Sequence, residues 1–99
     1  MAAKPLAIHP DALDELKSAL TWYSERSETA AINLVRELDN ALELIVQSPN
    51  VWPPGEHGTR KFTLRRFPFA LIYRETDASI QILAVAHGRR RPGYWKTRL

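Results

Sequence analysis

No cysteine occurs in the sequence, which excludes disulfide bonds and thiolate metal sites and suits a protein of the reducing cytoplasm. Long apolar runs are also missing. The stretch Ile82–Ala86 is far too short to span a membrane, and residues 1–10 lack the apolar core of a signal peptide. We therefore expect a cytoplasmic protein without membrane contact, and 99 residues suffice for one domain, residues 1–99.

Acidic residues are scarce in the second half of the chain. Residues 59–99 hold ten lysines and arginines against two acids, whereas residues 1–58 hold four bases against nine acids. The two halves therefore carry formal charges of +8 (10 − 2) and −5 (4 − 9), which add to the +3 of the whole chain. Such an asymmetry steers an anionic partner toward one side of the molecule.

Motifs for several kinds of catalysis are absent as well. The sequence has no HExxH pattern, no clustered Asp and His spacing, no GxSxG nucleophile elbow and no glycine-rich phosphate loop. We therefore expect neither a bound metal nor a cofactor.

Helical spacing dominates the first half of the chain, after a short edge strand expected around Leu6 and Ile8. Asp11 is expected to cap the first helix, and a polar break at Ser24–Ser27 separates it from a second helix that Pro49 stops. The apolar positions of the two helices are Ala12, Leu16, Ala19, Leu20 and Tyr23, and then Ala31, Leu34, Leu38, Ala41, Leu42 and Ile45.

Beyond an irregular connection at residues 47–58, the apolar period changes to two. Phe62 and Leu64 alternate with polar neighbours, as in a half-exposed strand. The stretches Phe69–Tyr73 and Ile80–His87 are apolar on both faces and are expected to be interior strands of one sheet.

The predicted architecture is α+β, with a helical hairpin packed on one face of a small, mainly antiparallel sheet. The element order is β-α-α-β-β-β, followed by a basic C-terminal tail. Because the helices cover one face, the basic side chains of the strands and tail are expected on the other face or at its rim. These side chains are Lys61, Arg65, Arg66, Arg74, His87 and Arg89–Arg91.

The tail, Gly88–Arg98, interleaves arginine and lysine with Tyr94 and Trp95. Guanidinium groups bind phosphates bidentately and aromatic rings stack on bases, so a nucleic-acid-binding module is one hypothesis. The two adjacent rings would be costly to leave exposed, and Pro92-Gly93 indicates a defined bend. We therefore expect the tail to combine packing with contact.

His87 has two interpretations that the sequence leaves open. Three following arginines favour the neutral ring, which suits a general base. Alternatively, the ring lies at the end of a strand and hydrogen-bonds the backbone. The pair Trp22-Tyr23 and Trp52 are expected to be core or hairpin anchors.

Several short motifs follow one another in a fixed order along the chain. They are Trp22-Tyr23, Pro49–Pro53, Leu64–Phe69, Ile72–Arg74, Ala84–His87 and the residues Arg90–Trp95 with Arg98. In this order the chain resembles the RelE/ParE toxins over nearly its whole length, and that family has the fold predicted above. The resemblance implies the toxin of a type II toxin-antitoxin system, which inhibits growth of its host until a small cognate antitoxin wraps around it.

The family resemblance leaves two targets. RelE-like toxins cut messenger RNA on the ribosome without a metal. ParE-like toxins instead poison DNA gyrase, which requires no catalytic acid or base. The patterns Phe67-Pro68-Phe69 and Pro92–Trp95 are closer to the ParE-like branch, which makes gyrase the expected target. In the RelE-like alternative, the implied catalytic residues are Arg65, Arg74, His87, Arg90 and Tyr94. The residues expected to bind the target or nucleic acid are Lys61, Arg66, Arg89, Arg91, Trp95, Lys96 and Arg98.

Overall fold

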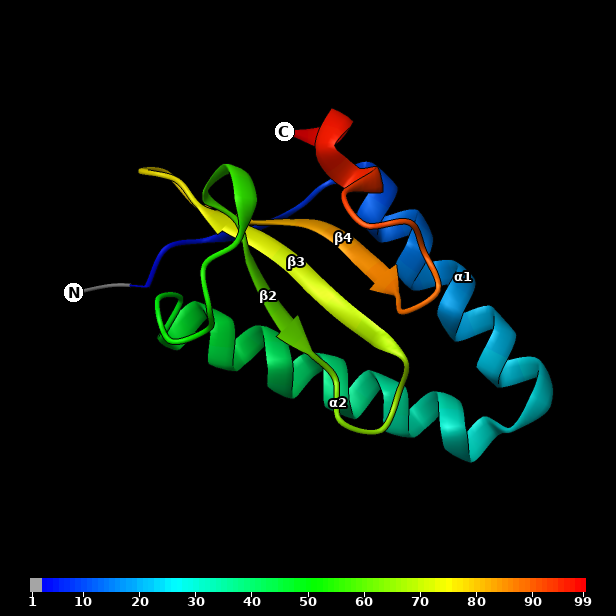
Figure 1. The fold of residues 1–99 in the computed structure, drawn as a ribbon. Coiled ribbons are helices and arrows are strands. Elements are labelled where there is room, and N and C mark those ends of the chain that lie inside the picture. The colour runs from blue at the N-terminus through cyan, green and yellow to red at the C-terminus, as the bar shows by residue number, and fades with distance from the viewer. Residues whose placement is uncertain (1–2) are drawn as a thin grey trace.

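Two helices and four strands build the fold of residues 3–99, the part of the chain that the computed structural model describes (Figure 1). The elements are β1 (Leu6–Ile8), α1 (Pro10–Arg26), α2 (Glu28–Gln47), β2 (Arg60–Thr63), β3 (Phe69–Glu75) and β4 (Ile80–His87), with short 3-10 turns η1 (Glu56–Gly58) and η2 (Tyr94–Arg98). This order confirms the predicted β-α-α-β-β-β arrangement, and the basic tail ends as η2.

The first helix begins earlier than predicted. His9 is its N-cap, and the Nδ1 atom of His9 accepts the backbone N–H of Asp11 at 3.0 Å. Pro10 suits the first helical position because it lacks an N–H that would be unpaired there. The prediction that Asp11 caps the helix is therefore wrong, since Asp11 lies in the first turn.

The polar break between the helices is a single residue, much shorter than the predicted Ser24–Ser27. The N–H of Ser27 donates to the carbonyl of Tyr23 at 2.7 Å and ends α1. The Ser27 hydroxyl accepts the N–H of Ala30 at 3.2 Å and caps α2. Neither helix of residues 3–99 is both long and apolar enough to cross a bilayer.

The sheet has the strand order β1-β4-β3-β2, which confirms that β3 and β4 are the interior strands. Only the edge strand β1 pairs in parallel among the described strands, so the sheet is mainly antiparallel. β2 ends before Leu64, which was predicted to lie within it. Leu64 is nevertheless buried, and its N–H donates to the carbonyl of Phe69 at 2.9 Å.

A bulge in β4 reverses the alternation of its side chains. The register against β3 shifts between Ile82 and Ala84 and leaves Leu83 as the extra residue. Val85 consequently joins the helix-facing core together with Ile82, although the two are three residues apart. His87 lies two residues after Val85 in the strand, so both side chains point to the same face. His87 therefore lies on the helical side of the sheet and not on the open face.

The two helices cover one face of the sheet and bury the main core between the layers (Figure 1). Its largest fully buried side chains are Leu34, Ile45, Leu71, Tyr73, Ile80 and Ile82. The connection from α2 to β2 is tied to this layer, since the Tyr73 hydroxyl donates to the carbonyl of Pro49 at 2.7 Å. The Trp52 ring lies 4.7 Å from that of Phe62, which confirms its anchoring role.

A second, small apolar cluster lies on the opposite face of the sheet. Trp95 of η2 packs there on Ile72 and Ala84 and is only 9% exposed. The chain turns into η2 at Gly93, whose φ of 76° lies in the left-handed region that glycine adopts without steric cost. The tail was expected both to pack on the sheet and to contact a partner, and Trp95 confirms the packing.

Candidate functional site

Strands β2 and β4 end at the same end of the sheet, where two arginine-bearing loops meet. The β2–β3 loop carries Arg65 and Arg66, and the loop after β4 carries Arg89–Arg91. The N–H of Gly88 donates to the carbonyl of Pro68 at 2.8 Å and joins the two loops. All five arginines are exposed, and we call this surface the basic rim.

Helix α2 fixes one of the two loops through Glu37. Its Oε2 atom accepts the backbone N–H of Arg65 and, at 3.3 Å, that of Arg66. The carboxylate therefore holds the loop backbone, while both guanidinium side chains extend from an exposed segment. This contact was not predicted from the sequence.

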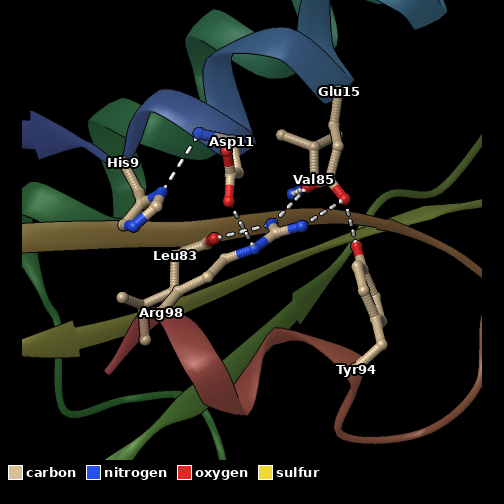
Figure 2. Close-up of polar contacts among 7 residues, drawn as sticks. All are labelled: His9, Asp11, Glu15, Leu83, Val85, Tyr94 and Arg98. Atoms are coloured by element: carbon tan, nitrogen blue, oxygen red, sulfur yellow. Dashed lines mark hydrogen bonds and ion pairs between the residues drawn. The ribbon is translucent and has the colours of Figure 1, made fainter.

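A partly buried carboxylate on α1, that of Glu15, holds the C-terminal segment in place (Figure 2). Glu15 accepts hydrogen bonds from the Tyr94 hydroxyl at 2.6 Å, from Arg98 Nη1 at 2.8 Å and Nη2 at 3.1 Å, and from the N–H of Val85 at 3.0 Å. Arg98 also donates to the carbonyl of Leu83 at 3.0 Å. We call Glu15, Tyr94 and Arg98 the C-terminal lock.

Protonation of the lock follows from its geometry. Burial alone raises the pKa of Glu15, but hydrogen bonds from Arg98, Tyr94 and Val85 outweigh it and hold the pKa below its ordinary value. Burial and the hydrogen bond to Glu15 raise the pKa of Tyr94 to about 12. The same carboxylate raises the pKa of Arg98. At neutral pH the lock thus holds one anion, one cation and a neutral phenol.

Three of the residues expected to bind the target make contacts with other parts of the chain. Trp95 is packed on the sheet, and the side chain of Arg98 is only 10% exposed. Lys96 forms an ion pair with Glu56 at 3.1 Å, and its hydrogen bond lowers the pKa of that carboxyl. These contacts assign Trp95 and Arg98 structural positions and leave Lys96 at the surface.

Arg90 connects the basic rim to the lock. Its guanidinium lies over the Tyr94 ring, 3.9 Å from the centroid, and the Tyr94 hydroxyl is held by Glu15. The lock thereby orients the exposed guanidinium of Arg90 through the Tyr94 ring. Lys61 lies further along β2, exposed on the open face of the sheet.

Two hollows lie on either side of the end of β4. The smaller, of about 340 Å³, is on the open face; its lining includes Lys61, Ile72, His87, Arg90, Arg91 and Trp95. The larger is a groove of about 660 Å³ between α1 and β4, which we call the α1–β4 groove. Its lining includes Asp14, Glu15, Trp22, Tyr23, Phe69, His87, Arg89 and Arg90. His87 and Arg90 line both hollows.

Comparison with known proteins decides the family. Residues 6–92 match the family described as ParE toxin of type II toxin-antitoxin system, parDE. The chain belongs to the ParE toxin family. Toxin ParE2 of Mycobacterium tuberculosis, from strains CDC 1551 / Oshkosh and ATCC 25618 / H37Rv, is 33% identical over 88 residues, which are 88% of this chain and 84% of the relative. The predicted ParE-like membership, and with it a type II toxin, is thereby confirmed.

A solved structure shares the fold of this ParE-family toxin. It is described as the chromosomal ParDE TA system from P. aeruginosa, and it matches with a TM-score of 0.73 at 24% identity. The match covers 86% of this chain and 96% of that chain.

The residues that a RelE-like mechanism would use are only partly brought together in this ParE-family toxin. His87, Arg90 and Tyr94 gather at one end of the sheet, with Arg65 in the neighbouring loop. Arg74 pairs with Gln81, five residues along β3 from the Phe69 that faces His87, which is a separation of roughly 16 Å. Its Nε donates to the Gln81 side chain at 2.8 Å.

Glu15 and Glu37 were not predicted as site residues, although the sequence carries a signal for both. Each acid lies within an apolar stripe, three residues after one buried position and four before the next: Ala12 and Ala19 for Glu15, and Leu34 and Ala41 for Glu37. An acid at such a position indicates a hydrogen-bonding partner elsewhere in the chain.

Trp22 was expected to be an anchor and is 51% exposed, so that prediction is wrong. Its ring lines the α1–β4 groove, and Arg26 lies over it at 3.9 Å. The adjacent Tyr23 is half-buried against Phe67, with ring centroids 5.1 Å apart, and does serve as an anchor.

Proposed function

We propose that this ParE-family toxin inhibits growth by binding and poisoning DNA gyrase, and that a cognate antitoxin suppresses it. The match to the ParE family over residues 6–92 is the observation that carries the proposal. The basic rim supports a recognition function, because its exposed arginines lie on two loops that a hydrogen bond and Glu37 hold in place. Fixed cations on a surface guide and orient a large anionic or acidic partner.

Cleavage of messenger RNA on the ribosome is the second candidate, and the described geometry favours it less. Attack of a 2′-hydroxyl on the adjacent phosphate needs a base and an acid at one phosphate. Arg74 lies far from His87 and Arg90 along β3. The Tyr94 hydroxyl donates to Glu15 and has a pKa of about 12, which makes it a weak proton donor.

The α1–β4 groove suits a segment of the antitoxin. Trp22 offers a large exposed ring there, and Tyr23 and Phe69 extend the apolar lining, while Arg89 and Arg90 lie at the basic end. A chain segment with apolar side chains and an acidic flank would complement both parts of this surface. An antitoxin bound in this way also reaches the basic rim and blocks access to the target.

Replacing Trp22 with alanine is expected to weaken antitoxin binding at least tenfold, since a large exposed ring in a groove is typical of an interface hot spot. Isothermal titration with the purified antitoxin encoded beside the toxin measures the change. Val51→Ala is the matched control, because Val51 is 70% exposed and lies outside the lining of the α1–β4 groove. Equal affinity of Trp22→Ala and the native toxin would place the antitoxin elsewhere.

Expression of the toxin alone is expected to arrest growth, and co-expression of the antitoxin is expected to restore it. Colony counts over several hours of induction, with the amount of folded toxin measured in parallel, provide the readout. Undiminished growth at a high level of folded toxin would contradict the proposed function.

A further inference from the structure

The same local arrangement of a histidine occurs twice within residues 3–99. The Nδ1 atom of His9 accepts the N–H of Asp11 at 3.0 Å, and Nδ1 of His87 accepts the N–H of Arg89 at 3.0 Å. In both cases the donor is the amide two residues later. This is the pattern that aspartate and asparagine side chains form in turns.

This hydrogen bond determines which ring nitrogen carries the proton. A backbone amide can only donate, so Nδ1 of His87 must present a lone pair. In the neutral ring the proton is then on Nε2, which becomes a donor. A ring nitrogen that already carries a proton cannot accept another, so neutral His87 has no free base at its outer edge.

The position of the ring directs that donor toward the functional surface. The ring of His87 packs against that of Phe69 with centroids 5.3 Å apart and an interplanar angle of 88°. The side chain is half-buried on the helical side of the sheet, where the residue lines the α1–β4 groove. The amide of Arg89 and the ring of Phe69 thus leave Nε2 as the polar atom available to a partner.

We propose that His87 is a fixed hydrogen-bond donor that binds an acidic side chain of the toxin's protein target through Nε2–H. This inference rests on the proposed function and adds a specificity residue to it. Arg89 and Arg90 flank the donor, so a carboxylate oxygen is the acceptor that this surface favours. His87 therefore contributes recognition and does not act as a general base.

The proton on Nε2 can be tested directly. Nitrogen-15 chemical shifts of the imidazole rings in the full-length toxin distinguish a protonated nitrogen from a bare one at neutral pH. We expect His87 and His9 to show the same pattern, with a bare Nδ1 and a protonated Nε2. A protonated Nδ1 on neutral His87 would overturn the inference, whatever the target of the toxin.

Two substitutions separate the roles of the two nitrogens. Asparagine at position 87 places an acceptor near Nδ1 and retains the turn, but it has no donor at the Nε2 position. Glutamine reaches that position with its amide N–H but does not reproduce the Nδ1 acceptor. The exposed N–H of Arg89 can then bind water. His9→Asn is the matched control for replacing the same turn histidine at the start of α1.

The concentration of toxin that halves gyrase supercoiling is expected to rise about tenfold for His87→Asn, the effect of one lost hydrogen bond, and less than threefold for His87→Gln. His9→Asn is expected to leave it unchanged. Circular dichroism and thermal unfolding confirm that each variant is folded. No change in His87→Asn, or an equal loss in both His87 variants, would overturn the donor role.

The inducer dose that arrests growth gives a second reading that does not depend on gyrase. If the native toxin arrests growth without inhibiting gyrase, the proposed target is wrong, and the same ranking of variants in the growth assay still supports the donor role. Loss of ribosome-dependent RNA cleavage in both His87 variants would instead identify His87 as a base and overturn it.

Discussion

Replacing Glu15 with alanine is expected to lower the free energy of unfolding by about 3 kcal/mol, the size seen when one partner of a buried ion pair is removed. The side chains of Glu15 and Arg98 are only 16% and 10% exposed, so water compensates poorly for the lost contact. The substitution also removes the acceptor of the Tyr94 hydroxyl and of the N–H of Val85. Of the ion pairs to Arg98, only the longer contact with Asp11, at 3.7 Å, would remain within residues 3–99.

Thermal unfolding followed by circular dichroism measures this effect. A loss of about 3 kcal/mol corresponds to a fall in Tm of about 15 °C for a domain of this size. Glu25→Ala is the matched control, because Glu25 lies on the same helix and is exposed. A fall of only one or two degrees in the Glu15 variant would show that the lock contributes little to stability.

The same residue gives stability a defined dependence on pH. The pKa of Glu15 is lower in the folded protein than its ordinary value of 4.5, so its contribution is fully present above about pH 4.5 and is lost as the pH falls through the lower, folded pKa. Tyr94, with a pKa of about 12, adds a contribution that is present below pH 10.0 and is lost as the pH rises toward 12. Glu15→Gln is expected to flatten the acid limb of the stability profile.

Reversing the charge of Arg90 is expected to abolish growth arrest at induction levels at which the native toxin is lethal. Arg90→Glu places a carboxylate beside the other arginines of the rim and opposite the acidic side chain that we propose on the target. Like charges at an interface cost several kcal/mol, which corresponds to a loss of affinity of about a hundredfold or more. Pull-down of gyrase with tagged toxin provides a direct measurement of binding.

Arg36→Glu is the control for the change in net charge. Arg36 is exposed on α2 and lies outside the lining of both hollows. We expect this variant to remain toxic. Toxicity that falls equally in both variants would show that overall charge matters and the position of Arg90 does not.

Most of the fold could be predicted from the sequence because its layers bury apolar residues at regular periods. The helical stripe around Leu34, Leu38 and Ile45 must face the sheet, and the apolar runs of β3 and β4 must lie in its interior. The bulge at Leu83 could not be predicted, because β4 is apolar on both faces and both registers bury it equally. That single residue decides on which side of the sheet His87 lies.

The functional site could be predicted only in part, for a related reason. Exposed arginines in the two loops were identified because charge patterns are local in sequence. The partners of Arg98 and Tyr94 were not, since Glu15 lies 83 and 79 residues away from them in the chain. The N-cap of α1 was also not predicted, because aspartate is a more common capping residue than histidine. Pro10 fits the first helical position, and this makes His9 the N-cap.

A parallel assay of the purified native toxin on gyrase and on ribosome-bound messenger RNA measures directly which of the two the toxin acts on. Relaxed plasmid, gyrase and ATP are incubated with increasing toxin, and translating ribosomes receive the same concentrations. We expect loss of supercoiling together with intact messenger RNA. Cleaved messenger RNA with undiminished supercoiling would contradict gyrase as the target.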